Sequence, residues 1–125
     1  MALTTLDAAR AETVEALCEL FVPGSGRVGP AVYVDAVVTA MPPPVREIAL
    51  ASIDALAPAA AGGAYALAEH AHTPGFAFVR ALAVEAYYSD FVAPGRDGPG
   101  AWSEIDFNTP LATRLAKDWS YLGIA

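Results

Sequence analysis

Proline and glycine recur along the first two-thirds of this chain and divide it into short segments. The chain contains 10 of each among its 125 residues. Both residues are unfavourable inside a regular helix, so helices here are expected to be short and to end where these residues occur. Between the interruptions, apolar side chains recur every three or four residues, which is the period of an amphipathic helix. Alternation with strand spacing is absent over any useful length. We therefore predict an all-α fold.

The interruptions set the expected helix boundaries. Thr5 is the expected N-cap of the first helix, with Asp7 in its first turn. Pro30 suits the first position of the second helix. Val and Tyr are dense enough in that segment to suit a strand as well, but their spacing favours a helix. The expected helices cover about residues 6–21, 30–41, 45–58, 64–70 and 74–89, with residues 59–63 as a small-residue joint and another helix beginning at 108–110.

The length of the chain allows one domain, because 125 residues leave no room for a second independent core. We predict a single domain over residues 1–125, a small bundle of about five to six helices with a Gly/Pro/aromatic-rich C-terminal extension. The helical body covers about residues 5–88, and a C-terminal docking segment covers about residues 89–125. The chain is 55% hydrophobic, which is high for a soluble protein of this size. Part of the apolar surface is therefore expected to face a partner.

The charge of the chain argues against two classes of partner. The formal net charge is −7, Lys117 is the only lysine, and the arginines are scattered singly. Nucleic acids and anionic membrane surfaces both need clustered cations, which this chain lacks. Apolar stretches are interrupted well before the roughly 20 residues of a membrane-spanning helix, so no membrane insertion is expected.

No motif in the chain indicates catalysis. The glycine clusters at residues 24–26 and 95–98 match neither a phosphate-binding loop nor a dinucleotide fingerprint and are interpreted as turns. Cys18 is the only cysteine and is expected to be a small buried side chain, since nothing near it in sequence would lower its pKa. We predict no catalytic residues and no cofactor-binding residues, and no catalytic activity from the chain alone.

The two histidines offer the one alternative chemistry. His70 and His72 form a His-x-His pair, which can supply two metal ligands. On a helix, residues i and i+2 point about 200° apart and do not chelate one ion together, whereas a loop would permit it. A third ligand would have to be a carboxylate. We interpret them as surface residues near a helix end and predict no metal site, keeping a small metal-binding enzyme as the less favoured alternative.

Most bulky aromatic side chains lie in the last third of the chain. They either fold back over the chain's own helices or dock on a partner, and the two interpretations are compatible, because Trp, Tyr and Arg concentrate binding energy at interfaces. A subset between Tyr87 and Phe107 is expected to reach the partner. The predicted partner-binding residues are Tyr87, Tyr88, Phe91, Arg96, Trp102, Phe107, Trp119 and Tyr121.

Three segments of the chain resemble a known family. The first is an apolar helix that runs into a Pro-containing turn at residues 16–25, and the second is the helix that follows at residues 29–35. The third covers residues 82–90 and ends in Tyr-Tyr-Ser-Asp. A Gly-rich turn, Trp102 and a closing Trp-Ser-Tyr-Leu-Gly come after it. In this order they resemble the gluconate 2-dehydrogenase subunit 3 family, the small helical subunits of FAD-dependent dehydrogenases of the glucose–methanol–choline type.

The resemblance implies a division of labour. The larger partner would hold FAD and oxidise a sugar or another alcohol, and this chain would stabilise or mature it without contributing a cofactor ligand. A generic helical interaction or chaperone module for another client is the alternative. The N-terminal sequence lacks the features of an export signal, so a cytoplasmic location is expected, with export alongside a signal-bearing partner as the alternative.

Overall fold

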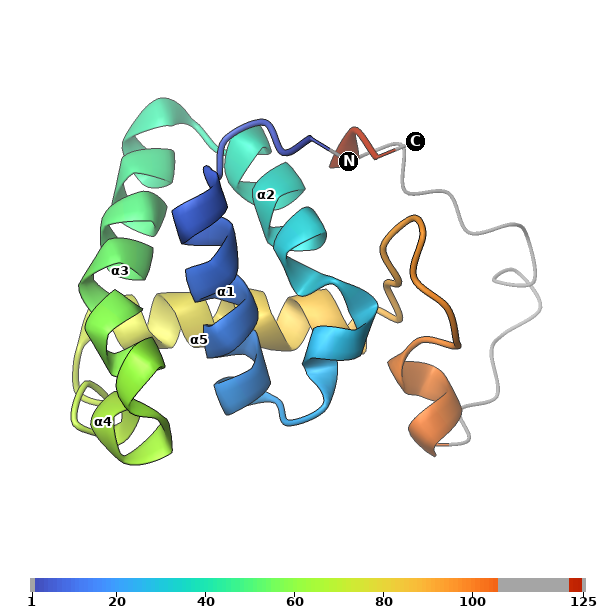
Figure 1. Cartoon of the computed structure of the whole chain (residues 1–125). Coiled ribbons are helices and arrows are strands. Elements are labelled where there is room, and N and C mark those ends of the chain that lie inside the picture. Colours follow the sequence, from blue (N-terminus) through green and yellow to red (C-terminus); the bar gives the residue numbers. More distant parts are fainter. Residues whose placement is uncertain (1, 106–121, 125) are drawn as a thin grey trace.

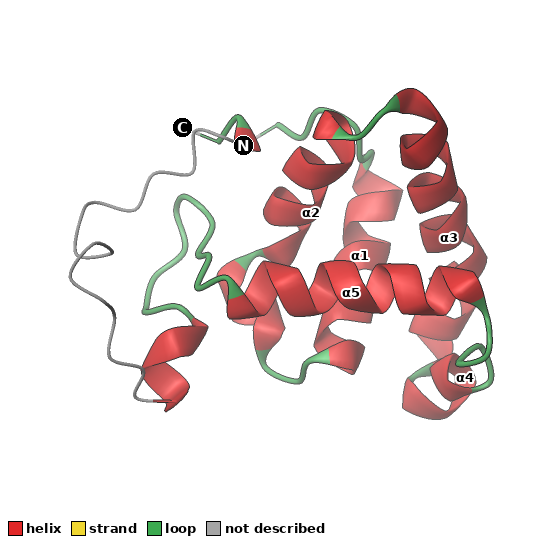
Figure 2. Ribbon diagram, turned by 180° about the vertical axis from the view of Figure 1, so that it is seen from behind, coloured by secondary structure: helices red, strands yellow, loops and turns green. Residues whose placement is uncertain are grey.

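The computed structural model describes residues 2–105 and 122–124, and within these residues it contains helices and loops but no strand (Figures 1 and 2). The all-α prediction is confirmed. The further helix expected from residue 108 lies outside the described residues. The elements are α1 (Ala8–Phe21), η1 (Ser25–Val28), α2 (Pro30–Ala40), α3 (Pro43–Gly62), α4 (Ala64–Ala68), α5 (Pro74–Tyr88) and η2 (Ala101–Ile105), where η denotes a short 3₁₀-helix.

Three helices form a layer that the fourth long helix crosses. α1 lies between α2 and α3 and packs against both (Figure 1). α5 runs across the back of this layer and contacts all three helices, as the view from behind in Figure 2 shows. The short α4 follows α3 and packs against it. One side of α5 therefore faces the core, and its opposite side faces outward.

The core lies between the three-helix layer and α5. Leu17 of α1, Val38 of α2 and Ile53 of α3 are all fully buried, as the helical spacing predicts. Val45 and Ile48 continue the predicted apolar stripe of α3 towards its N-terminus, but both are exposed. The first turns of α3 extend past the crossing with α5 (Figure 1). Ile48 lines an open groove with Gly75 at the start of α5, which leaves its side chain 57% exposed.

Helix starts follow local hydrogen bonding. The predicted N-cap Thr5 is wrong, because α1 begins later and Asp7 is its cap: the Asp7 carboxylate accepts a hydrogen bond from the Arg10 amide at 2.8 Å. The Thr5 hydroxyl instead pairs with the Thr39 hydroxyl at 2.6 Å. For α5 the predicted cap is confirmed, since the Thr73 hydroxyl accepts from the Phe76 amide at 3.2 Å.

The predicted end of α3 at Pro58 is also wrong. The helix passes through Pro58 and ends at Gly62, although a proline removes one backbone hydrogen bond and typically costs about 3 kcal/mol inside a helix. Three alanines after the proline favour helix, and the buried Ala59 anchors this turn in the core. The break falls at Gly63, whose positive φ of 88° suits glycine. Among the described residues no helix, α3 included, is long and apolar enough to cross a membrane.

A buried carboxylate ties the N-terminal segment to α2. Asp35 is 5% exposed. Its two oxygens accept hydrogen bonds from the backbone amides of Thr4, Thr5 and Leu6 at 2.8–2.9 Å. Each amide contributes a donor to a negative charge that has left water, which is the arrangement that makes a buried carboxylate tolerable. The segment before α1 is therefore fixed on the bundle, with Leu6 in the core.

Candidate docking surface

The part of the predicted C-terminal docking segment that the structure describes, residues 89–105, folds back on the helical body. The Ala93 amide donates to the Val28 carbonyl at 2.8 Å. Phe91 is fully buried, and its ring meets the Tyr33 ring edge-on with centroids 5.2 Å apart. This geometry agrees with the interpretation that aromatic residues near the C-terminus cover the chain's own helices.

Asp90 holds together the two ends of the loop between α5 and η2. Its φ of +65° is in the left-handed region that few residues other than glycine adopt, and this reverses the chain after α5. The Asp90 carboxylate then accepts from the Trp102 amide at 3.1 Å. Gly100 lies so close that a Cβ there would be 2.1 Å from the Asp90 carboxylate oxygen. A glycine is therefore required where the two ends of the loop meet.

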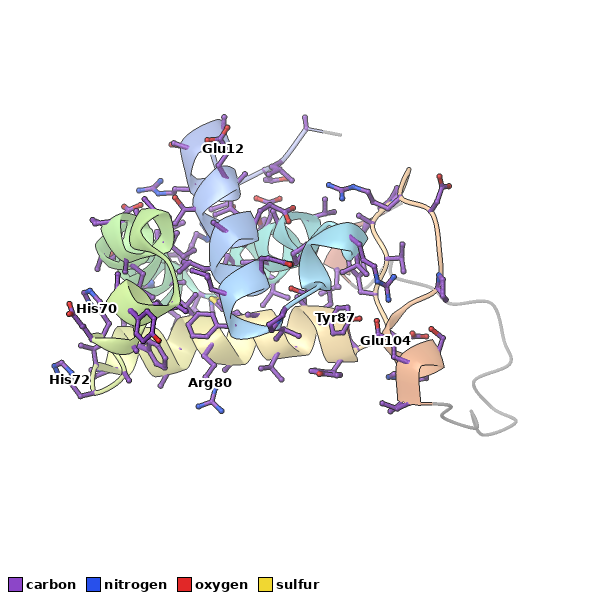
Figure 3. All side chains as sticks on the ribbon, turned by 60° about the horizontal axis from the view of Figure 1, so that its bottom comes forward. Glu12, His70, His72, Arg80, Tyr87 and Glu104 are labelled. Atoms are coloured by element: carbon purple, nitrogen blue, oxygen red, sulfur yellow. The ribbon has the colours of Figure 1, made fainter. Side chains whose placement is uncertain are left out.

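Three polar side chains fasten η2 to the body. The Arg27 guanidinium from η1 lies 3.0 Å from the Glu104 carboxylate of η2, and the Tyr87 hydroxyl of α5 donates to the same carboxylate (Figure 3). The guanidinium also lies over the Tyr87 ring, 5.7 Å from its centroid. The Tyr87 hydrogen bond and the Arg27 charge hold the pKa of Glu104 below its usual range. Burial and the bond to Glu104 raise the pKa of Tyr87.

We expect the attachment of η2 to weaken in acid. Glutamate in an unfolded chain has a pKa of about 4.3. Because the pKa of Glu104 is lower in the folded state, its stabilising effect is complete above that value and is lost as the pH falls through the lowered folded pKa. In urea unfolding, the wild type should be slightly more stable than Glu104→Gln at pH 7. The difference should shrink as the pH falls below about 4.3. A difference that stayed constant below this pH would contradict the role of the ionised carboxylate.

The predicted partner-binding residues fall into three groups: buried, exposed or half-buried, and outside the described residues. Tyr87 and Phe91 are 2% and 0% exposed, so the expectation that these rings face a partner needs correction: they pack inside this chain. Tyr88 is 50% exposed, Arg96 is exposed in the loop, and Trp102 is half-buried, with its indole nitrogen donating to the Tyr88 carbonyl at 2.9 Å. The remaining three, Phe107, Trp119 and Tyr121, lie outside the described residues.

The outward side of α5 carries an apolar row that the sequence-based prediction missed. Ala77, Ala81, Val84 and Tyr88 follow one another at intervals of four, three and four residues, and all four are exposed. This spacing places them on one side of the helix. We call this row the α5 stripe. The signal was present in the sequence, but a second row on the same helix, which includes Val79 and packs into the core, accounted for the helical pattern.

Two open grooves adjoin the α5 stripe. The first, of about 470 Å³, runs along the stripe itself. The second, of about 230 Å³, lies between the end of α1, α4 and the start of α5, and its walls include the rings of Phe21 and Phe76, which meet edge-on at 5.0 Å. Arg80 lines both grooves. Beyond α5, Ile105 of η2 and Tyr65 of α4 are also strongly exposed. Exposed apolar side chains therefore occur on α5 and also on α3, α4 and η2.

The groups considered for chemistry occupy structural or solvent-exposed positions. Cys18 is buried as predicted, and burial together with the nearby Glu15 raises the pKa of its thiol to about 12. His70 and His72 lie in the turns between α4 and α5 (Figure 3). In the described part of the chain, no group of three His, Cys, Asp or Glu residues is placed to hold a metal ion. Glu85 accepts a hydrogen bond from the Tyr33 hydroxyl at 2.8 Å.

No protein-family model matches the chain, and neither a curated protein nor a solved structure matches it significantly. The exposed surface of α5 and the sequence resemblance are therefore the two sources for a functional proposal.

Proposed function

We propose that this chain is a non-catalytic small subunit that binds a larger FAD-dependent oxidoreductase of sugars or other alcohols and stabilises or matures it. The α5 stripe carries the proposal. It presents a continuous apolar row, ending in a half-exposed tyrosine, on the side of α5 that no other described element covers. An amphipathic helix with an exposed apolar row is a common docking element, and tyrosine is among the side chains that contribute most at interfaces.

Two further observations support a binding role. Three carboxylates of α5, the loop after it and η2 are engaged in the fold: Glu85 with the Tyr33 hydroxyl, Asp90 with the Trp102 amide, and Glu104 with Arg27 and Tyr87. The lone thiol is protonated at neutral pH because its pKa is raised to about 12. The type of partner comes from the resemblance to the gluconate 2-dehydrogenase subunit 3 family, which assigns the FAD and the oxidation chemistry to the large subunit.

Co-expression with an FAD-dependent oxidoreductase gene of the glucose–methanol–choline type from the same genome tests the proposal. The tagged chain should retain the flavoprotein in stoichiometric amount, and the purified complex should show flavin absorbance. The proposal fails if the chain is stable alone and the flavoprotein is fully active without it. A captured protein that lacks flavin would instead favour the generic interaction or chaperone module.

A matched pair of substitutions tests the docking surface. Val84 of the α5 stripe and Val45 of α3 are 38% and 37% exposed, so neither substitution removes a core side chain, and circular dichroism of each free variant checks that it folds. We expect Val84→Asp to weaken flavoprotein capture by about tenfold or more, which corresponds to about 1.4 kcal/mol, because the interface would bury an unpaired charge. Val45→Asp should bind like the wild type. Wild-type capture by a folded Val84→Asp variant would place the interface elsewhere.

A further inference from the structure

One arginine stands out by its lack of interactions. Of the arginines that the structure describes, Arg10 and Arg27 form ion pairs, and Arg46 and Arg96 donate to backbone carbonyls. Arg80 makes no hydrogen bond or ion pair with any described residue. An unpaired guanidinium carries five donors and a full charge, so it is well suited to bind an anionic group that is not part of this chain.

The position of Arg80 adds a second, independent observation. It projects from the middle of α5 away from the bundle (Figure 3) and lines both the groove along the α5 stripe and the groove formed by α1, α4 and α5. Apolar side chains predominate in both grooves. Glu85, which lines the same groove, already accepts a hydrogen bond from the Tyr33 hydroxyl. The cation therefore lies between two apolar surfaces, where a docked partner would exclude water around it.

We propose that Arg80 binds an aspartate or glutamate side chain of the partner, and that a bulky apolar side chain next to this acid enters the groove walled by Phe21 and Phe76. The inference rests on the proposed function and specifies the chemistry of the partner's contact segment. A guanidinium and a carboxylate pair through two parallel hydrogen bonds, and this contact strengthens when it is dehydrated. Arginine surrounded by apolar side chains is a frequent centre of binding energy.

Charge favours a different protein over a second copy of this chain as the occupant. A two-fold contact centred on α5 would place two Arg80 side chains near each other, because the same patch faces itself in such an interface. It would also join two chains that each carry a formal net charge of −7. On a chain with this net charge, a positively charged side chain marks one of the few places that attract an acidic partner side chain. Arg80 therefore supplies position and specificity as well as attraction.

A cross-linking experiment tests the contact at residue level. Because Lys117 is the only lysine, Arg80→Lys in a Lys117→Arg background leaves position 80 as the only side-chain amine. A water-soluble carbodiimide joins this amine to a touching carboxylate as an amide, while the reagent takes up the water as its urea. In the co-purified complex, mass spectrometry should find position 80 linked to an aspartate or glutamate of the flavoprotein. Separately, Arg80→Glu should reduce capture of the flavoprotein by about tenfold or more.

Arg10→Lys in the same background is the control for reactivity. The Arg10 guanidinium lies 2.8 Å from the Asp54 carboxylate, so the lysine introduced there should link within the chain. A complex that forms normally but gives no link from position 80, or a link to a second copy of this chain, would overturn the Arg80 contact and leave the proposed function standing. Normal capture by Arg80→Glu would do the same. Failure of the unsubstituted chain to capture any flavoprotein would defeat the proposed function and the inference together.

Discussion

Phe91→Ala is expected to lower the free energy of unfolding by about 3–5 kcal/mol, the range typical for deleting a fully buried aromatic ring. Phe91 has no exposed surface, and its loss would also remove the edge-on contact with Tyr33. The substitution leaves a cavity between the loop after α5 and the helices beneath it. Since this loop carries the chain from α5 to η2, we expect near-native helices and a loosened C-terminal segment in the protein that remains folded.

Urea unfolding followed by circular dichroism measures the effect, and Tyr88→Ala is the matched comparison. Tyr88 is an aromatic residue close by in sequence but is half-exposed on the α5 stripe. Its removal should cost less than about 1 kcal/mol of folding free energy but weaken capture of the flavoprotein. Phe91→Ala should show the opposite pattern under conditions where it is folded. If the Phe91→Ala protein were stable but bound the flavoprotein poorly, Phe91 would contribute to the interface and not to the core.

Asp35→Ala is expected to cost about 3 kcal/mol of folding free energy. Hydrogen bonds to a charged group contribute about 1.5–3 kcal/mol each, and amides that lose their partner regain only part of this from water. The Leu6 amide is buried with its carboxylate partner, whereas the Thr4 and Thr5 amides are partly buried. Residues before α1 should detach first, exposing Leu6. The urea midpoint and the amide exchange of these residues measure the two effects.

Two further variants serve as comparisons for the loss of stability in Asp35→Ala. Asp35→Asn keeps one acceptor oxygen in the same place and should lose less than Asp35→Ala, because some of the three amides stay paired. Asp54→Ala removes a different carboxylate, one in an exposed ion pair with Arg10, and should cost under about 1 kcal/mol. If Asp35→Ala were as mild as Asp54→Ala, the N-terminal segment would not depend on the buried carboxylate.

The spacing of apolar residues and the positions of proline and glycine were sufficient to predict the helical class and most of the helix boundaries. The errors have local physical causes. Thr5 and Asp7 are both good caps, and the choice between them depends on Thr39 and Asp35, some 30 residues away in sequence. Pro58 ends a helix by propensity, but burial of Ala59 and the alanines around it outweigh that preference. Long-range contacts of this kind leave no trace in a window of neighbouring residues.

The exposure of single side chains was harder to predict than the fold. Aromatic composition does not say which ring turns inward: the adjacent Tyr87 and Tyr88 end up 2% and 50% exposed. The direction of each depends on the rotation of α5 against the layer beneath it. Alanine also contributes to the α5 stripe without any aromatic signal. Arg80 is one of several scattered arginines in the sequence, and only the structure shows that no residue it describes pairs with this side chain.

The loop after α5 and η2 are attached to the helical body mainly by polar contacts, and this affects local unfolding. Residues 94–105 are held by side-chain hydrogen bonds to Arg27, Tyr87 and Asp90, and Ala101 is the one residue among them that belongs to a buried apolar cluster. Releasing them breaks a few polar contacts and exposes little core. We therefore expect this part of the chain to open at a lower free-energy cost than the four long helices. A partner that binds across α5 and η2 would hold this part closed and rigidify the subunit as it assembles.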